Sequence, residues 1–404
     1  MRTSPARERL LSHEASFIPY SPPSTGESEP PEPVEVVEIV DGLDLEYAAV
    51  RTKAGLFDQP HRGVIEVTGG ERTEFLNNMI TQELKDLEPF GVTHSFWLNR
   101  KGRIDADLRL ISLPERILFD LDVFTARPTA EALSNFIFSE DCTLTDASET
   151  THRLGLYGPT AARVLEEVAM AREGDAIGQL ADRRATIVEI AGTEVVVARD
   201  DWLGVPCFEL FAPASGAESV HAALEEAGAA NNPSAPPNSE EGRVALRPIG
   251  WHAVNLARVE AGCPMLFLDF GHSNLPAESG SLEDRVSFTK GCYLGQEVVA
   301  RMHALGKPKQ TLVALRFDAA TAETAQPTTG AHVSLPDEPG ATIVGSVTSS
   351  SISPMLGAEP VAFAMLKTKH AEAGSRVVVE VGGNFLPAFI QPSLRFWPQP
   401  GTDS

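Results

Sequence analysis

The sequence predicts an α+β protein that ends in a small β-barrel, and two patterns in the chain support this fold class. Between residues 36 and 240, stretches with apolar residues at helical spacing are mixed with short, alternating, strand-like runs. From Thr311 onward only short strand-like runs remain, and turn residues separate them. The length of 404 residues, 42% of them hydrophobic, is enough for two or three domains with cores of their own.

The N-terminal part is predicted to hold a disordered extension and a first α+β unit. Residues 1–35 form the extension, because residues 19–35 are rich in Pro, Ser and Glu and offer little to bury. The first unit covers residues 36–150, with helices predicted over residues 44–53 and 72–87. Its strand-like runs are residues 64–68, 95–99, 107–112 and 117–123.

A second α+β unit is predicted for residues 151–240. A helix begins at Pro159, a residue favoured in the first helical turn, and residues 185–197 alternate as a strand pair does. The stretch from Ala229 to Gly242 contains three prolines, so we predict a loop or linker there.

The C-terminal part is predicted to complete this core and then form the barrel. Residues 241–308 contain a helix over residues 249–259, and residues 309–404 form the barrel domain. The six barrel strands are predicted at residues 312–317, 333–335, 343–349, 361–366, 377–381 and 385–390.

The charge balance argues against two classes of partner. A formal net charge of −23 at pH 7 predicts repulsion from nucleic-acid phosphates and from anionic membrane surfaces. No apolar run is long enough to cross a bilayer, and the first twenty residues lack a hydrophobic signal core. We therefore expect a cytoplasmic protein with no direct nucleic-acid partner and no membrane partner. The sequence does not predict the oligomeric state.

The cysteines and histidines show no metal-binding spacing. Cys142, Cys207, Cys263 and Cys292 lie far apart and form no CxxC pair. A disulfide framework is not expected in a chain of this size, and no metal site is predicted. No GxGxxG or P-loop motif occurs either, which disfavours a nucleotide-driven enzyme.

Cys292 is the candidate catalytic residue because it comes just before a predicted short helix, Leu294 to His303. The unpaired amides and the partial positive charge of a helix N-terminus favour a thiolate, and Lys290 adds a second favourable charge. The alternative is that Cys292 is a small buried hydrophobe in a turn. The residues alone leave both interpretations open.

The run from Lys290 to Glu297 resembles the K-G-C-[FY]-x-G-Q-E motif of the YgfZ-type folate-binding proteins, which are similar to the aminomethyltransferase (T protein) of the glycine cleavage system. Further segments follow the same superfamily order, beginning with AGLFD at residues 54–58. The resemblance implies two related ferredoxin-like α+β units around a folate cavity, a C-terminal barrel, and tetrahydrofolate or a derivative as cofactor. The motif residues are Lys290, Gly291, Cys292, Tyr293, Gly295, Gln296 and Glu297.

Four more residues are folate-binding candidates through this resemblance. Glu209 and Arg258 match segments that line the folate site in the related aminomethyltransferases. Asn99 belongs to a run that resembles the first substrate-side loop. A folate ring also needs an aromatic wall, which Trp97 or Trp202 could supply. The alternatives are an exposed Glu209, an Arg258 paired with a carboxylate such as Glu260, and a Trp97 that packs in a core.

One departure from the transferase pattern bears on the chemistry. Aminomethyltransferases resemble N-x-x-G-G-[IV]-[IV]-D-D in this loop, and the first Asp of the pair is associated with folate activation. Ala106 holds that position here. Asp105 and Asp107 flank it, but in a strand their side chains point to the opposite face. We therefore expect the catalytic carboxylate to be missing and the protein not to be a classical aminomethyltransferase.

The first functional hypothesis is a tetrahydrofolate-binding, YgfZ-like protein that assists the assembly or repair of iron–sulfur enzymes, including radical enzymes that modify tRNA. These iron–sulfur client enzymes would be its partners, and Cys292 would act by transient iron or sulfur ligation or by redox exchange. One alternative is a folate-dependent aminomethyltransferase acting on a lipoyl carrier protein. Another is a folate-binding scaffold without thiol chemistry.

Overall fold

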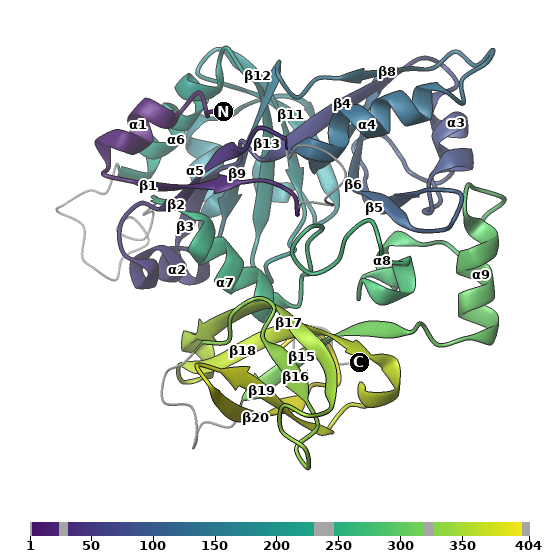
Figure 1. The fold of residues 1–404 in the computed structure, drawn as a ribbon. Helices are drawn as coiled ribbons and strands as arrows, with labels where there is room; N and C mark the ends of the chain where they lie inside the picture. Colours follow the sequence, from purple (N-terminus) through teal and green to yellow (C-terminus); the bar gives the residue numbers. More distant parts are fainter. Residues whose placement is uncertain (1, 24–30, 230–245, 318–325, 398–404) are drawn as a thin grey trace. The chain divides into compact units, whose positions relative to one another are not determined.

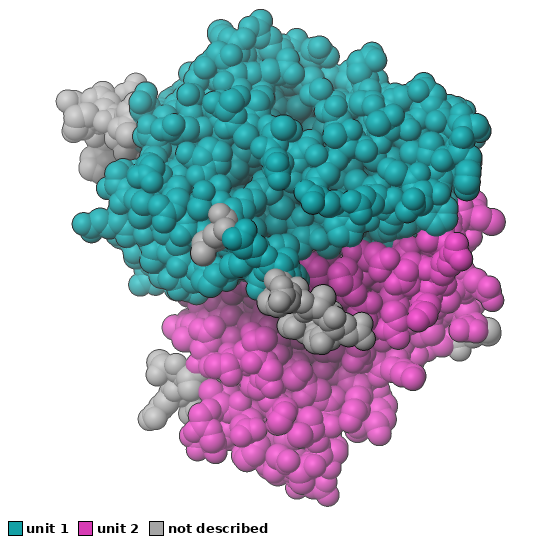
Figure 2. All heavy atoms as spheres, turned by 45° about the horizontal axis from the view of Figure 1, so that its top comes forward, with its two compact units in different colours: residues 1–97, 106–254 teal, residues 98–105, 255–404 magenta. Residues whose placement is uncertain are grey.

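The chain divides into two compact units. The computed structural model describes residues 2–23, 31–229, 246–317 and 326–397 (Figure 1). Unit 1 comprises residues 1–97 and 106–254, and unit 2 comprises residues 98–105 and 255–404 (Figure 2). Within the described ranges, no helix combines the length and the apolar character that a membrane span requires.

The larger sheet of unit 1 has seven strands in the order β10-β11-β12-β13-β9-β3-β14. All neighbours are antiparallel except β14, which runs parallel to β3. Helices α5 (Ala161–Val168) and α6 (Ala217–Ala229) pack against this sheet through an apolar core that includes Leu56, Leu210 and Val220. The strands are β3 Ala54–Asp58, β9 Thr151–Tyr157, β10 Met170–Gly174, β11 Arg184–Ile190, β12 Thr193–Arg199, β13 Cys207–Pro213 and β14 Leu246–Ile249.

A second sheet of five strands has the order β5-β6-β7-β4-β8. An apolar core cluster joins the two sheets inside unit 1. It contains Ile111 and Leu118 from this sheet and Ile187 and Phe211 from the larger one. The strands are β4 Arg62–Thr68, β5 Val92–Leu98, β6 Ile104–Ser112, β7 Arg116–Asp122 and β8 Thr143–Asp146. Four further α-helices begin in the described part of unit 1 after the N-terminal segment. They are α2 Leu43–Thr52, α3 Arg72–Met79, α4 Val123–Ser134 and α7 Trp251–Ala261.

Helix α3 is shorter than the predicted helix over residues 72–87. The chain becomes extended at Ile80, and the backbone N–H of Thr81 donates to the carbonyl of Phe96. The Asn77 side chain then accepts a hydrogen bond from the backbone N–H of Leu84. These contacts between distant residues stop the helix, although the apolar spacing continues.

The N-terminal segment differs from the predicted disordered extension. Helix α1 (Arg7–Ser12) is followed by β1 (Ser16–Tyr20), which pairs antiparallel with β2 (Val34–Ile39). Leu10 is buried in a small cluster with Val37, and Arg7 forms an ion pair with Glu35. A six-residue helix is too short to give a periodic signal, which explains the difference. The other predicted domain boundaries remain predictions, and the predicted linker lies outside the described residues from residue 230 onward.

Unit 2 contains the predicted barrel. Six strands close in the order β15-β18-β17-β16-β19-β20, and β15 pairs with β20 to complete the cylinder. Its interior is apolar, with Leu315, Val333, Val379 and Ile390 among the buried residues. The α+β class and the small barrel are therefore confirmed. The barrel strands are β15 Gln310–Phe317, β16 His332–Ser334, β17 Ile343–Ser353, β18 Glu359–Lys367, β19 Arg376–Val381 and β20 Asn384–Ile390.

Unit 2 also holds two short α-helices outside the barrel, α8 (Leu282–Arg285) and α9 (Gln296–Leu305). Single 3-10 turns connect elements in both units. These turns are η1 Ile177–Gln179, η2 Pro276–Glu278, η3 Pro354–Leu356 and η4 Thr368–His370.

Candidate functional site

A buried carboxylate on β7, Asp120, is bound by three arginines of unit 1. Its side chain has no exposed surface. Arg62 Nε donates to Oδ1 at 2.9 Å, Arg109 Nη1 donates to Oδ2 at 2.6 Å, and Arg153 Nη1 lies 3.1 Å from Oδ1. Burial by itself raises the pKa of Asp120, but the charges of Arg153, Arg62 and Arg109 outweigh it and hold the pKa well below its usual value. Asp120 is therefore ionised at neutral pH.

Glu209, a predicted folate ligand on β13, is the second carboxylate of this network and is 1% exposed. Its Oε2 accepts hydrogen bonds from Arg153 Nη2 and Gln59 Nε2, both at 2.8 Å. Its Oε1 accepts from the uncharged donors Trp202 Nε1 at 3.0 Å and Tyr157 Oη at 3.2 Å. The alternative of an exposed Glu209 is therefore wrong, because the carboxylate is enclosed by protein donors.

Asp200 is the third carboxylate of the network. Arg109 Nε donates to its Oδ2 at 2.7 Å, His94 Nε2 lies 2.8 Å from the same oxygen, and Arg183 Nε lies 3.1 Å from Oδ1. Burial raises the pKa of Asp200, but His94 and the two arginines lower it by more, so the pKa is well below its usual value. Buried charges at this density are tolerated because each carboxylate has a cationic partner.

The turn between β3 and β4 supplies several side chains to this region. Gln59 donates to Glu209 and Arg62 to Asp120, while Asp58 Oδ1 lies 2.6 Å from His152 Nε2. Residues 54–58 contribute only to the family resemblance in the sequence, and this turn was not predicted to be part of the site. The sequence does mark this turn as a candidate. Residues 58–62 (DQPHR), with four polar side chains and one proline, separate two apolar strand-like runs.

His61, in the same turn, is a buried imidazole in an aromatic setting. It is 4% exposed, and its Nδ1 atom has no hydrogen-bond partner. The rings of Tyr20, Phe57 and Trp251 lie 5.7, 5.7 and 5.9 Å from the imidazole, measured between ring centroids. Burial, followed by the positive charge of Arg62, lowers the pKa of His61 to about 3. His61 is therefore neutral at physiological pH.

A neutral, buried His61 predicts that stability falls on mild acidification. Between the ordinary histidine pKa of about 6.5 and the folded-state value of about 3, the unfolded chain binds the extra proton and the folded chain does not. The free energy of unfolding should therefore fall by up to roughly 1.4 kcal/mol per pH unit across this range because of this residue. Urea unfolding between pH 7 and 4 measures the slope. His61→Phe should reduce it, and an unchanged slope would contradict the assignment.

Strand β6 places Ala106 and its neighbouring carboxylate on different faces. Ile104, Ala106 and Leu110 are fully buried, which puts Ala106 on the apolar face of the strand. Asp107 lies two residues before Arg109 and therefore shares its face, and Arg109 binds the carboxylates of the network. The expectation that the Asp105 and Asp107 side chains point to the face opposite Ala106 is therefore confirmed, and this face also carries Arg109.

Trp97 and Asn99 have well-defined local roles. Trp97 is 2% exposed and packs edge-on against Phe136 in unit 1, with 6.1 Å between ring centroids. In unit 2, the Asn99 side chain accepts a hydrogen bond from the backbone N–H of Lys101 at 2.9 Å and donates to Asp105 Oδ1 at 2.8 Å. Asn99 thus stabilises its own loop. The folate-binding roles of both residues remain predictions.

Arg258 on α7 belongs to unit 2 and is fully buried. Its Nη1 donates to Asp269 Oδ2 at 2.7 Å and to the carbonyl of Cys263 at 3.1 Å. Its Nη2 donates to Ser349 Oγ at 2.6 Å, and its Nε donates to Asn255 Oδ1 at 3.0 Å. The guanidinium thus joins a helix, a loop and a barrel strand of unit 2. The predicted contact of Arg258 with folate remains a prediction.

Glu260, suggested above as the ion-pair partner of Arg258, has another role. Its Oε1 accepts a hydrogen bond from Ser353 Oγ at 2.6 Å, and its backbone carbonyl accepts from Phe396. Asp269 is the carboxylate that pairs with Arg258.

The motif around Cys292 forms an exposed loop in unit 2. Helix α9 begins at Gln296, two residues later than predicted, and Cys292 is exposed four residues before it. Lys290 is buried, with Nζ 5.4 Å from the centre of the Tyr293 ring, and burial raises the pKa of Tyr293 to about 12. Gly295 has φ 81°, and a Cβ there would lie 2.8 Å from the Asn99 carbonyl.

The other residues of the motif are less enclosed. Gly291 and Glu297 are exposed, and Gln296 Nε2 donates to the carbonyl of Gly291 at 3.3 Å. Gly295 is required by the close approach of two loops, whereas Cys292 is a free cysteine exposed to solvent. In the described part of the chain, no three His, Cys, Asp or Glu side chains are grouped so that they could hold a metal ion.

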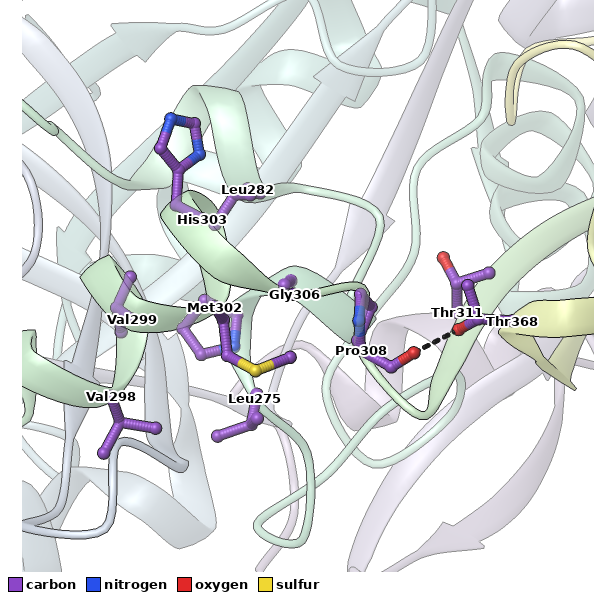
Figure 3. Close-up of a pocket in the computed structure, with 12 residues that line it drawn as sticks. Leu275, Leu282, Val298, Val299, Met302, His303, Gly306, Pro308, Thr311 and Thr368 are labelled. Carbon is purple, nitrogen blue, oxygen red and sulfur yellow. Dashed lines mark hydrogen bonds between the residues drawn. The ribbon is translucent and has the colours of Figure 1, made fainter.

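A small apolar pocket of about 280 Å³ lies beside α9 in unit 2 (Figure 3). Met302 and Leu275 face each other across it, and Thr368 Oγ1 donates to the Pro308 carbonyl at its other end. His303, at the edge, stacks on Phe288 with 3.9 Å between ring centroids. The pocket can hold an apolar group, but its lining contains no carboxylate, arginine or lysine for catalysis.

Comparisons with known proteins match nearly the full length of the chain. The GCVT N-terminal domain matches residues 20–290, and the glycine cleavage T-protein C-terminal barrel domain matches residues 310–394. An aminomethyltransferase of Streptomyces avermitilis is 29% identical over 347 residues, which covers 85% of this chain and 86% of the relative. A probable aminomethyltransferase of Halobacterium salinarum is 28% identical over 404 residues and covers 96% and 97%. The crystal structure of the glycine cleavage system aminomethyltransferase T from Bartonella henselae has a TM-score of 0.80 at 22% identity, with 98% of both chains covered.

These relatives contradict the first functional hypothesis. We expected a YgfZ-like protein that assists iron–sulfur enzymes, with Cys292 at the centre of its activity. The curated relatives that span most of the chain are instead named aminomethyltransferases. The hypothesis relied on the eight-residue motif and on Ala106, two local features, whereas the similarity extends over nearly all of both chains.

Proposed function

The chain belongs to the glycine cleavage T-protein family, and on that basis we propose that it is a folate-dependent aminomethyltransferase that acts on a lipoyl carrier protein. The names of the relatives support the reaction class. The observation that carries the proposal is the buried carboxylate of Glu209. The uncharged donors Trp202 and Tyr157 approach its Oε1, with Arg109 Nη1 3.5 Å from the same oxygen, and Arg153 holds its Oε2.

The residues around Glu209 have the hydrogen-bonding chemistry that a reduced pterin requires. Arg153 and Gln59 both donate hydrogen bonds to Oε2. The two donors on Oε1, Trp202 and Tyr157, are neutral, so pterin N–H groups can replace them without a change of charge. Trp202 is partly exposed, which makes that side of the carboxylate the accessible one. When bound, tetrahydrofolate would accept the methylene carbon of the aminomethyl group, with release of ammonia and the free carrier thiol.

We assign the acid–base carboxylate of this reaction to Asp107. The residue is half-buried on the polar face of β6, two positions from Arg109, whose guanidinium binds Asp120 and Asp200. A general acid must come within hydrogen-bond reach of the departing amine, and Asp107 is the carboxylate of β6 that lies in unit 1 on the face of Arg109. Asp105 stabilises the loop of residues 98–105 in unit 2, where its carboxylate accepts a hydrogen bond from the Asn99 side chain.

Asp107→Asn should lower kcat by roughly 10²-fold or more, the usual size of a general acid–base contribution, with a smaller change in KM. The measurement is formation of methylenetetrahydrofolate and ammonia from tetrahydrofolate and an aminomethylated lipoyl carrier protein. Asp105→Asn is the matched control and should keep most of the activity. If both variants are equally active, the assignment of Asp107 is wrong; if the wild-type protein forms no product, the proposed function is wrong.

Because of the motif at residues 290–297, we propose that this protein lies near the YgfZ-type branch of the family. This placement does not require thiol chemistry. Because Cys292 is exposed and the proposed reaction uses no protein thiol, Cys292→Ser should retain full aminomethyl transfer in the same assay.

A further inference from the structure

Glu209 is enclosed in unit 1, so a ligand can bind its carboxylate only where one of the surrounding donors can move away. The side chain is 1% exposed, and its Oε2 accepts from Arg153 and Gln59. Its Oε1 accepts from the neutral donors Trp202 and Tyr157. Tyr157 is fully buried, whereas Trp202 is partly exposed. Trp202 is therefore the donor that can move toward solvent.

The indole of Trp202 has the shape and the hydrogen-bonding chemistry of the ligand that we propose for this site. An indole and a reduced pterin are both fused two-ring systems with an uncharged N–H group at the ring edge. The indole donates this N–H to Glu209 Oε1 at 3.0 Å. Its ring lies edge-on to Tyr157, with 5.9 Å between ring centroids and 88° between the ring planes. The indole thus fills a space beside Glu209 that matches a two-ring ligand.

The backbone on both sides of Trp202 is held in place. Asp201, the residue before it, accepts a hydrogen bond from Arg199 Nη2 at 2.8 Å. Leu203, the residue after it, is fully buried, and its carbonyl accepts from Arg51 Nη1 at 2.9 Å. A change of the Trp202 rotamer, with the backbone unchanged, is therefore the motion that would uncover Glu209 Oε1.

We propose that the pterin ring binds in the space that the Trp202 indole fills, and that Trp202 is a gate that competes with the pterin N–H for Glu209 Oε1. This inference rests on the proposed function and adds to it the place of the ring and the residue that controls access. A neutral N–H suits this oxygen better than a cationic group, because Arg109 Nη1 already lies 3.5 Å from it. The closed gate weakens the apparent affinity in proportion to its population.

The test uses the full chain and tetrahydrofolate as the probe, titrated calorimetrically without oxygen. Trp202→Phe keeps an aromatic ring but removes the competing N–H, so it should bind tetrahydrofolate about tenfold more tightly than wild type. Tyr157→Phe is the matched control, because it removes the other neutral donor to the same oxygen from a side chain that is fully buried. Its affinity for tetrahydrofolate should be equal to that of wild type or lower.

Fluorine NMR of protein labelled with 5-fluorotryptophan observes the gate itself. The chain has four tryptophans, and the Trp202 resonance is the one that is lost in Trp202→Phe. Saturation with tetrahydrofolate should increase the difference in its chemical shift between H₂O and D₂O, because the indole moves into solvent. A Trp202 with only a structural role would show no such change.

Three results would each overturn the inference. They are binding of tetrahydrofolate by Trp202→Phe that is equal to or weaker than that of wild type, equal strengthening by Tyr157→Phe, and a Trp202 resonance that saturation leaves unchanged. If none of the proteins binds tetrahydrofolate, the proposed function itself fails, which is a different result from equal binding by wild type and Trp202→Phe.

Discussion

Asp120→Asn is expected to lower the free energy of unfolding of unit 1 by at least about 3–5 kcal/mol, the usual cost of breaking a buried ion pair. The substitution leaves Arg62, Arg109 and Arg153 with one carboxylate fewer in the interior. Because domains are stable by only about 5–15 kcal/mol, much of unit 1 should be unfolded in mild denaturant. Hydrogen exchange followed by mass spectrometry measures the loss separately in each unit.

A suitable control lies in the same sheet. Glu66 on β4 pairs with Arg116 at 3.4 Å, and both side chains are more than a third exposed. Exposed ion pairs contribute little, so Glu66→Gln should change stability by less than about 1 kcal/mol. If Asp120→Asn were as mild as Glu66→Gln, the buried network would not stabilise unit 1 as we infer.

Asp120 also determines part of the acid sensitivity of the fold of unit 1. The folded-state pKa values of Asp120 and Asp200 are lower than the usual aspartate value of about 3.9. The unfolded chain therefore binds more protons just below that value, and the stability from these groups is present above about pH 4 and is lost as the pH falls further. Asp120→Asn should flatten the unfolding free energy below about pH 4, whereas the effect of His61 lies at higher pH.

Arg258→Ala is expected to cost about 3–5 kcal/mol in unit 2, because it leaves Asp269 as an unpaired buried carboxylate. It also removes the hydrogen bond to Ser349, by which α7 is held to β17. Exchange protection should fall in α7, in residues 263–269 and in β17. Exchange in unit 1 should stay close to that of wild type.

Replacing both charges separates the two contributions. The double variant Arg258→Met with Asp269→Asn removes the cation and the anion together and should recover part of the stability lost in Arg258→Ala. Measured tetrahydrofolate binding in this folded double variant also tests the predicted ligand role of Arg258. If the affinity for tetrahydrofolate is unchanged, Arg258 has only a structural role in unit 2. A large loss of affinity would support the predicted contact of Arg258 with folate.

Much of the fold could be predicted because each strand carries its own signal. The runs at residues 361–366 and 377–381 alternate or are continuously apolar between turn residues, and both are barrel strands. Helix α3 was overestimated because the hydrogen bonds that end it come from Phe96 and Leu84. Helix α1 was missed because its stability comes from burial of Leu10 and from contacts with β2 rather than from periodicity.

The site was less predictable from the sequence for a physical reason. Glu209 was identified only through the family resemblance. Its partners Gln59, Arg153 and Trp202 come from separate parts of the sequence and meet it only in the folded protein. A single sequence contains no information on which arginine meets which carboxylate. The alternation of β6 could be predicted and places Asp107 opposite Ala106, but the sequence does not say which of the two faces is covered by other parts of the chain.

The composition of unit 2 has a consequence for the synthesis of the chain on the ribosome. Residues 98–105 belong to this unit, yet all of residues 106–254 follow them before the rest of unit 2 emerges. The barrel then closes only when β20, which pairs with β15, is released. At 5–20 residues per second, about 7–27 seconds separate the end of unit 1 from that moment. During this interval unit 1 can fold, while the loop from residue 98 waits for partners that have not yet been translated.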